Sequence, residues 1–269
     1  MSVNIFRHEF RIRLKSVIIW SLSLTVLLMF FFAMYPIFAD EAALMNEFLA
    51  RYPQELRAAF GMDRMDLSTV LGFYGFTFMF VQLCLAIQAS NYGFGLVSIE
   101  ESELTADFLL SKPVSRTQVL TSKLLAALTG LAIVNLVVWA VSFIAIELFR
   151  GDHEYEAGPL LLVLISIVVF QLFFLSVGVI ISLLVKRVRS VTPYGLGLGF
   201  GAYVLNAFSG VFGDVALELI TPFKHLDPTY ILVEGAYDVP LLLLNIAVSL
   251  VAIGCSYWLY NRRDIPAVS

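Results

Sequence analysis

Six long stretches of the sequence contain no Asp, Glu, Lys or Arg, and this pattern limits the fold more than any other feature. The stretches cover approximately residues 17–39, 70–97, 124–146, 158–185, 191–213 and 239–261. A helix needs about 20 apolar residues to cross the hydrocarbon core of a bilayer. In lipid every backbone N–H and C=O group must be paired within the protein, and the alternation typical of barrel strands is absent. We therefore predict an all-α integral membrane protein with six transmembrane helices.

The composition excludes an ordinary water-soluble domain. Hydrophobic residues make up 59% of the chain and charged residues 14%, whereas soluble domains average about 45–50% and about 25%. We expect residues 1–269 to form a single transmembrane domain in the lipid bilayer, with no cleaved signal peptide. The net charge of -4 is small and gives no argument for a nucleic-acid partner, and we expect none.

The basic residues indicate how the helices lie across the membrane, because Lys and Arg gather in short cytoplasmic connections. With the N-terminus inside, twelve of them are cytoplasmic, namely Arg7, Arg11, Arg13, Lys15, Lys112, Arg116, Lys123, Lys186, Arg187, Arg189, Arg262 and Arg263. Five remain outside, namely Arg51, Arg57, Arg64, Arg150 and Lys224. We therefore predict that both termini are cytoplasmic.

A short amphipathic segment precedes the first stretch. Its apolar and basic residues fall on different helical faces, with Val3, Phe6, Phe10 and Leu14 on one and Arg7, Arg11 and Lys15 on another. This pattern is typical of a helix that lies in the headgroup layer. We predict an N-terminal interfacial elbow helix, held by basic side chains that reach toward the headgroups without a further binding role.

The cytoplasmic connection between the second and third spans carries the most information about function. It begins with an acidic cluster, continues through good helix formers, and stops before Pro113, which disfavours helical geometry in the preceding residue. Leu104, Phe108 and Leu109 give the segment an apolar face that a linker would not need. Ser115 and Gln118 have the spacing of a capping box, which predicts the start of the next helix.

This connection resembles the cytoplasmic signature of type-2 ATP-binding-cassette (ABC) exporter permeases. Residues 100–116 read Glu-Glu-Ser-Glu-Leu-Thr-Ala-Asp-Phe-Leu-Leu-Ser-Lys-Pro-Val-Ser-Arg, and Lys123 follows. In that family an acidic start, a threonine, a Leu-Leu-Ser-x-Pro-Val-Ser-Arg run and a downstream lysine surround the coupling helix that docks into the ATPase. The resemblance also includes His8-Glu9, Tyr52-Pro53, Phe60-Gly61, Pro222-Phe223, Tyr230-Ile231-Leu232 and Arg262-Arg263-Asp264. It thus covers essentially the whole chain.

The resemblance implies a six-helix exporter half in the plasma membrane, paired with an identical or a different second half and with two ATPase subunits. The coupling residues that it implies are Glu100, Glu101, Glu103, Leu104, Phe108, Leu109, Leu110, Lys112, Pro113 and Arg116. The sequence contains no Gly-x-x-x-x-Gly-Lys-Ser/Thr loop to bind nucleotide phosphates. We therefore expect no nucleotide-binding domain and no cofactor in this chain, with ATP and Mg²⁺ bound by the partner ATPase.

Two stripes of small and polar residues lie within the spans. The second span carries Gln88, Asn91 and Gly95, and the fifth carries Gly195, Gly199, Ala202 and Asn206. Small residues let helices approach closely, and amides can bond across the contact. Two interpretations therefore stay open, namely helix packing and the lining of a cargo path. The resemblance favours the second, because that family uses these two helices for its pathway.

Two other classes of protein are alternatives. A membrane-embedded enzyme acting on lipid-linked substrates would need clustered Asp, Glu or His at a membrane face, and a secondary transporter would need charged groups within its spans. His8, His153 and His225 lie far apart in the sequence, and the predicted spans carry no charge. We predict no catalytic residue and no metal site, and the charge-free spans favour a hydrophobic or amphipathic cargo.

Overall fold

All regular elements in the described part of the chain are helices. The computed structural model describes residues 2–42, 47, 51–53, 57, 65–102, 114–185, 190–212 and 215–262. Long helices cover the six charge-free stretches, the first of which is shared by two helices, and several helices extend beyond the predicted bounds. They are α1 (Val3–Phe32) with α2 (Tyr35–Asp40), α5 (Val70–Ser102), α7 (Arg116–Phe149), α8 (Ala157–Leu184), α9 (Val191–Phe212) and α13 (Val239–Arg262).

Five segments among the described residues are long and apolar enough to cross a membrane. They are Val3–Asp40, Val70–Val97, Arg116–Phe149, Ala157–Leu184 and Val239–Arg262. The helix predicted as the fifth span, α9, is not among them. At 22 residues and about 1.5 Å per residue it is nevertheless long enough to span the hydrocarbon core. The chain is thus a multi-pass membrane protein, and the count of six spans stays a prediction.

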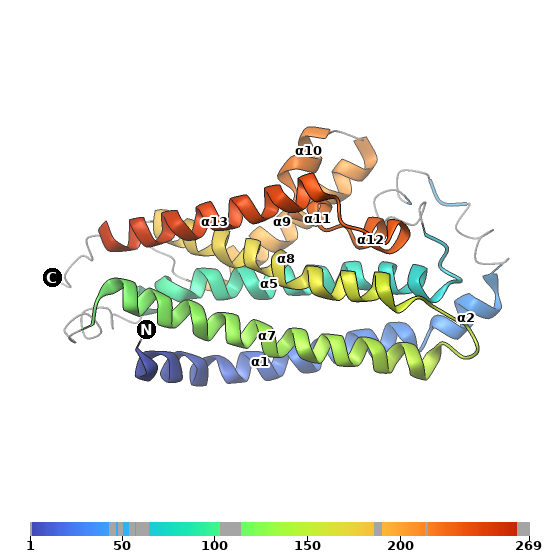
Figure 1. Cartoon of the computed structure of the whole chain (residues 1–269), viewed down its shortest axis with the longest axis horizontal. Coiled ribbons are helices and arrows are strands. Elements are labelled where there is room, and N and C mark those ends of the chain that lie inside the picture. Colours follow the sequence, from blue (N-terminus) through green and yellow to red (C-terminus); the bar gives the residue numbers. More distant parts are fainter. Residues whose placement is uncertain are drawn as a thin grey trace.

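The long helices form an elongated bundle (Figure 1). Helix α1 packs along α7, α5 packs against both α8 and α9, and α8 also packs against α13. The start of α1 and the end of α13 lie at one end of the bundle, and α2 lies at the other (Figure 1). This arrangement fits an even number of crossings. We call the two ends the terminal end and the α2 end.

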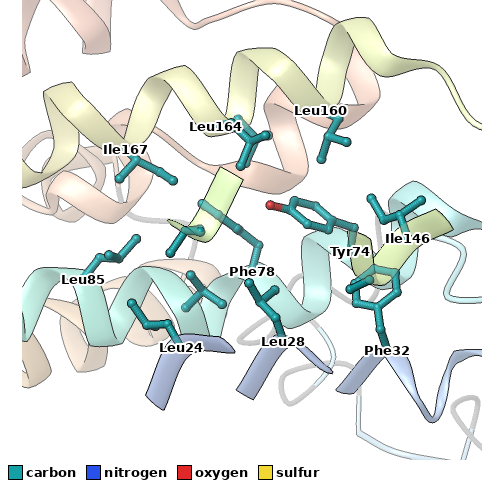
Figure 2. Packing of buried hydrophobic residues seen from close by; sticks show 14 of the residues in the cluster. Leu24, Leu28, Phe32, Tyr74, Phe78, Leu85, Ile146, Leu160, Leu164 and Ile167 are labelled. Carbon is teal, nitrogen blue, oxygen red and sulfur yellow. The ribbon is translucent and has the colours of Figure 1, made fainter. Parts of the chain in front are cut away.

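Apolar side chains from four helices fill the core near the α2 end. Leu24, Leu28 and Phe32 of α1 meet Tyr74, Phe78 and Leu85 of α5, with Ile146 of α7 and Leu160, Leu164 and Ile167 of α8 (Figure 2). All ten are at most 1% exposed. The hydroxyl groups of Tyr74 and Ser142 lie 3.0 Å apart within this core, so the phenol group is paired where lipid offers no partner.

Helix α1 corrects the prediction of a separate elbow helix. It runs from Val3 to Phe32 without interruption, so the amphipathic segment is the first part of the membrane-spanning helix. No Gly or Pro in this range provides a break. The helix ends instead at Phe32, because Pro36 has no N–H to donate to the Phe32 carbonyl group.

Between α9 and α13 the chain forms three short helices, α10 (Val215–Ile220), α11 (Pro222–His225) and α12 (Pro228–Glu234). A proline begins each of the last two, where its missing N–H costs nothing. Gly235, with a φ of 63°, ends α12 in the left-handed conformation. Phe223, Leu226 and Ile231 are at most 3% exposed. The short helices are therefore packed into the bundle rather than extended away from it.

Candidate functional site

A buried lysine joins three helices at the terminal end. Lys123 of α7 is only 2% exposed, and its Nζ donates a hydrogen bond of 2.8 Å to the carbonyl oxygen of Leu96 on α5. The same amine lies 3.3 Å from a carboxylate oxygen of Glu9 on α1. One buried charge thus links α1, α5 and α7 close to the point where α5 enters the connection to α7.

An arginine completes this buried charge cluster. Arg13, one turn after Glu9, lies 3.3 Å from the second carboxylate oxygen, and its guanidinium group lies 5.3 Å from the ring centre of Tyr92 on α5. The Tyr92 hydroxyl group donates to the Ser16 hydroxyl oxygen at 3.3 Å. Removing one partner of a buried ion pair is much more costly than the pair is worth. The cluster therefore fixes how α1, α5 and α7 fit together.

The start of α7 has the structure that the sequence predicted. The side chain of Ser115 accepts a hydrogen bond from the N–H of Gln118, and the Gln118 side chain accepts from the N–H of Ser115. This confirms the capping box. The hydroxyl oxygen of Ser122 accepts a hydrogen bond of 2.8 Å from the N–H of Ser2, which attaches the beginning of α1 to the same turns of α7.

Arg116 ties the start of α7 to the end of α13. Its Nη1 donates to the carbonyl oxygens of Tyr260 and Asn261, both at 3.3 Å. These carbonyl groups belong to the last turn of α13, where no further helical N–H is available to pair them. Nearby, the hydroxyl groups of Thr121 and Tyr257 lie 2.8 Å apart. Both flanks of the connection are therefore anchored, through α5 to α1 and through α7 to α13.

Only part of the predicted coupling set lies within the described structure. Glu100 and Glu101 belong to the last turns of α5, and Arg116 begins α7. Seven further residues lie outside the described residues, namely Glu103, Leu104, Phe108, Leu109, Leu110, Lys112 and Pro113.

The two predicted stripes face each other in the bundle. A Cβ atom on Gly195 would lie 2.9 Å from the backbone nitrogen of Asn91, and one on Gly199 would lie 3.0 Å from that of Ile87. The backbones of α5 and α9 therefore come close at both glycines, as in other small-residue helix contacts. The carbonyl oxygen of Ala202 accepts a hydrogen bond of 3.1 Å from the Thr221 hydroxyl group. Gly95 is buried and Asn206 is half-buried.

Helix α5 also packs against α8, a contact that the sequence did not single out. Gln171 of α8 donates an amide hydrogen bond of 3.4 Å to Gln88, and both side chains are at most 1% exposed. Gly93 and Gly178 bring the two backbones together, since a Cβ atom on Gly178 would lie 3.2 Å from the Gly93 Cα atom. The residue types of Gln171 and Gly178 are a signal for a helix contact, but the sequence does not show which residues they meet.

A second polar cluster surrounds α11. The Nε2 atom of His225 lies 3.0 Å from the carbonyl oxygen of Leu219, and its Nδ1 lies 3.4 Å from the Asn245 side-chain nitrogen on α13. This pairing suits a neutral ring that donates from Nε2 and accepts at Nδ1. Burial lowers the pKa of His225 from its ordinary value, against smaller opposing effects of the Leu219 carbonyl group and Asp238. Sequence reasoning had treated this histidine as one of three isolated ones.

Comparison with known proteins identifies the family. The family described as "ABC-2 family transporter protein" matches residues 3–265, nearly the whole chain. No curated protein matches the sequence, and no solved structure matches it either. A match of this extent includes every long helix of the bundle and the connection between α5 and α7. The chain therefore belongs to the ABC-2 family of transporter proteins.

Proposed function

We propose that this chain is the permease half of an ATP-driven exporter in the plasma membrane. Membership of the ABC-2 family implies a membrane transport component that associates with ABC ATPase subunits. In our proposal two halves, identical or different, enclose the cargo path, and two ATPase subunits bind and hydrolyse ATP with Mg²⁺. Six helices span the membrane, both termini are cytoplasmic, and residues 100–112 form the coupling helix.

The anchoring of this connection is the observation that supports the coupling role. A lever transmits movement only if both of its ends are fixed to elements that must move. At one end the Leu96 carbonyl oxygen is bonded to Lys123, which is paired with Glu9. At the other end Arg116 is bonded to the last turn of α13. Closure of the ATPase pair would thus displace α5 and α7 together with α1 and α13.

The proposed cargo path runs beside α5 and α9. Gly195 and Gly199 are used in close packing within the chain, which leaves the opposite face of α9 for the path or for the second half. That face includes Leu196 and Phe200, which are 48% and 50% exposed. Its aromatic and aliphatic side chains suit a hydrophobic or amphipathic cargo better than an ion.

The test is co-purification of the tagged chain from its native membrane in mild detergent, with mass spectrometry of the recovered proteins. We expect stoichiometric recovery of a soluble ABC ATPase. Replacing Phe108 and Leu109 with Asp should release the ATPase and abolish its stimulation, because the apolar face of the connection would carry two charges. Membrane insertion should not change.

The matched control adds the same charge to polar positions of the same segment, as Ser102→Asp with Ser111→Asp. This variant should retain the ATPase. If the Phe108→Asp, Leu109→Asp variant retained the ATPase and stimulated it fully, the coupling assignment would be wrong. Recovery of the wild-type chain without any ATPase, repeated after crosslinking, would contradict the exporter proposal itself.

A further inference from the structure

The outward face of the first turns of α1 carries three basic side chains. Arg7, Arg11 and Lys15 are spaced four residues apart, so they lie above one another on one side of the helix. All three are exposed. In contrast, Arg13 is buried, paired with Glu9 and placed over the ring of Tyr92 on α5. The first turns of α1 thus carry one buried basic residue, Arg13, on the inward face and a stripe of three exposed basic residues on the outward face.

The charge of this stripe is not neutralised by its own helix. Glu9 is the first acidic residue of the chain, and Asp40 is the next. Both carboxylate oxygens of Glu9 are occupied, one by Lys123 and the other by Arg13, each at 3.3 Å. Among the described side chains no ion pair reaches Arg7, Arg11 or Lys15. The outward face therefore keeps its positive charge and would attract a negative partner from outside these residues.

The position of the stripe identifies that partner as a lipid surface. Because α1 continues without a break, the same outward face becomes wholly apolar one turn later, with Ile18, Leu22 and Val26 at 65%, 63% and 60% exposed. These side chains face hydrocarbon, so the basic stripe lies at the level of the headgroups. Exposed Ile12 and Leu14, at 59% and 39%, are interleaved with it. They would be unfavourable against an acidic soluble protein and fit the border of the acyl region.

We propose that the outward face of α1 binds phospholipids with a negatively charged headgroup, in the leaflet at the terminal end of the bundle. Arg7, Arg11 and Lys15 contact the headgroups, and Ile12, Leu14 and Ile18 contact the adjoining acyl chains. Each basic residue near a membrane surface favours an anionic over a neutral lipid by about fivefold. This inference does not depend on the cargo or on the ATPase.

The test uses the full-length chain in nanodiscs that contain equal amounts of phosphatidylglycerol and phosphatidylcholine. The chain is released into detergent, and the lipids that remain bound are counted by native mass spectrometry. We expect the wild-type chain to retain phosphatidylglycerol preferentially. Arg7→Gln with Arg11→Gln should lower this preference at least fivefold. High salt should weaken the wild-type preference, because exposed charges are screened.

Two further variants keep the result interpretable. Arg51→Gln with Arg150→Gln removes the same charge at the α2 end and should keep the wild-type preference. Arg7→Lys with Arg11→Lys keeps the charge and should also keep it, whereas loss of the preference in this variant alone would indicate a structural role for arginine. Equal retention of the two lipids by the wild-type chain, or an unchanged preference in the Arg7→Gln, Arg11→Gln variant, would overturn the proposal.

Discussion

The Nζ atom of Lys123 lies 2.8 Å from the carbonyl oxygen of Leu96 and joins the third turn of α7 to the last turns of α5. These two residues flank the connection between the helices, 27 residues apart in sequence. Since the amine also pairs with Glu9, any movement of the end of α5 must either carry α1 and α7 with it or break a buried charge interaction. The terminal end of the bundle therefore moves as one unit or loses stability.

Lys123→Met should destabilise the protein by about 3 kcal/mol, because it leaves the Glu9 carboxylate, whose side chain is only 13% exposed, with fewer partners. Thermal unfolding of the purified chain in detergent measures the change. Adding Glu9→Gln should recover part of the loss, since the double variant no longer buries an unbalanced charge. Lys15→Met, an exposed lysine in the same region, should change stability by less than about 0.5 kcal/mol. An equal loss in both single variants would contradict the importance of the buried cluster.

Gly93→Ala should also destabilise the bundle, because the new methyl group would collide with the backbone of α8 at Gly178 and Leu175. Overpacking of this kind costs about 1–3 kcal/mol. Gly254→Ala on α13 is the matched control, since a Cβ atom there meets nothing within 4 Å. It should be neutral or slightly stabilising, as alanine favours a helix. If the two substitutions change the stability in detergent by the same amount, the close approach of α5 and α8 is not important for stability.

The helices could be predicted from sequence because lipid imposes one dominant rule, that each crossing be apolar and internally hydrogen-bonded. The capping box of Ser115 and Gln118 was predictable for a different reason, since its two partners are only three residues apart. The family match bears out the resemblance drawn from residues 100–116, although the match itself does not depend on that segment alone. Local signals thus identified the long helices and the family, although several helices extend beyond the predicted bounds.

The tertiary contacts were not predictable, because one sequence does not show which distant polar residues meet. Gln88 was noticed, but its partner Gln171 is 83 residues away. Glu9 and Lys123 are separated in the sequence by most of the first half of the chain. Their pairing holds the start of α1 in line with its span. The amphipathic pattern does not show this pairing, and it therefore predicted a separate helix that is not seen.

Arg116→Met should loosen the end of α13 without unfolding the chain. Its two bonds to the carbonyl oxygens of Tyr260 and Asn261 are 3.3 Å long and lie near the surface, so we expect a loss of about 1 kcal/mol. Hydrogen exchange should become faster in the last turns of α13 and stay unchanged in α8. Arg150→Met, at the other end of α7, should leave exchange in α13 as it is. Unchanged exchange in the Arg116 variant would mean that the C-terminal end of α13 is held by other contacts.

Acidification should destabilise the fold through His225. Burial lowers the pKa of this side chain below its ordinary value of 6.5, so the unfolded chain takes up the proton at a higher pH than the folded chain. Stability should therefore fall as the pH decreases through about 6.5 toward the lower pKa of the folded state. His225→Gln removes the titrating ring and should reduce this dependence, whereas His153→Gln, at an exposed position, should not. Unfolding of the three proteins in detergent at a series of pH values provides the comparison. If the wild type and His225→Gln lose stability in parallel on acidification, protonation of this histidine is not what destabilises the bundle.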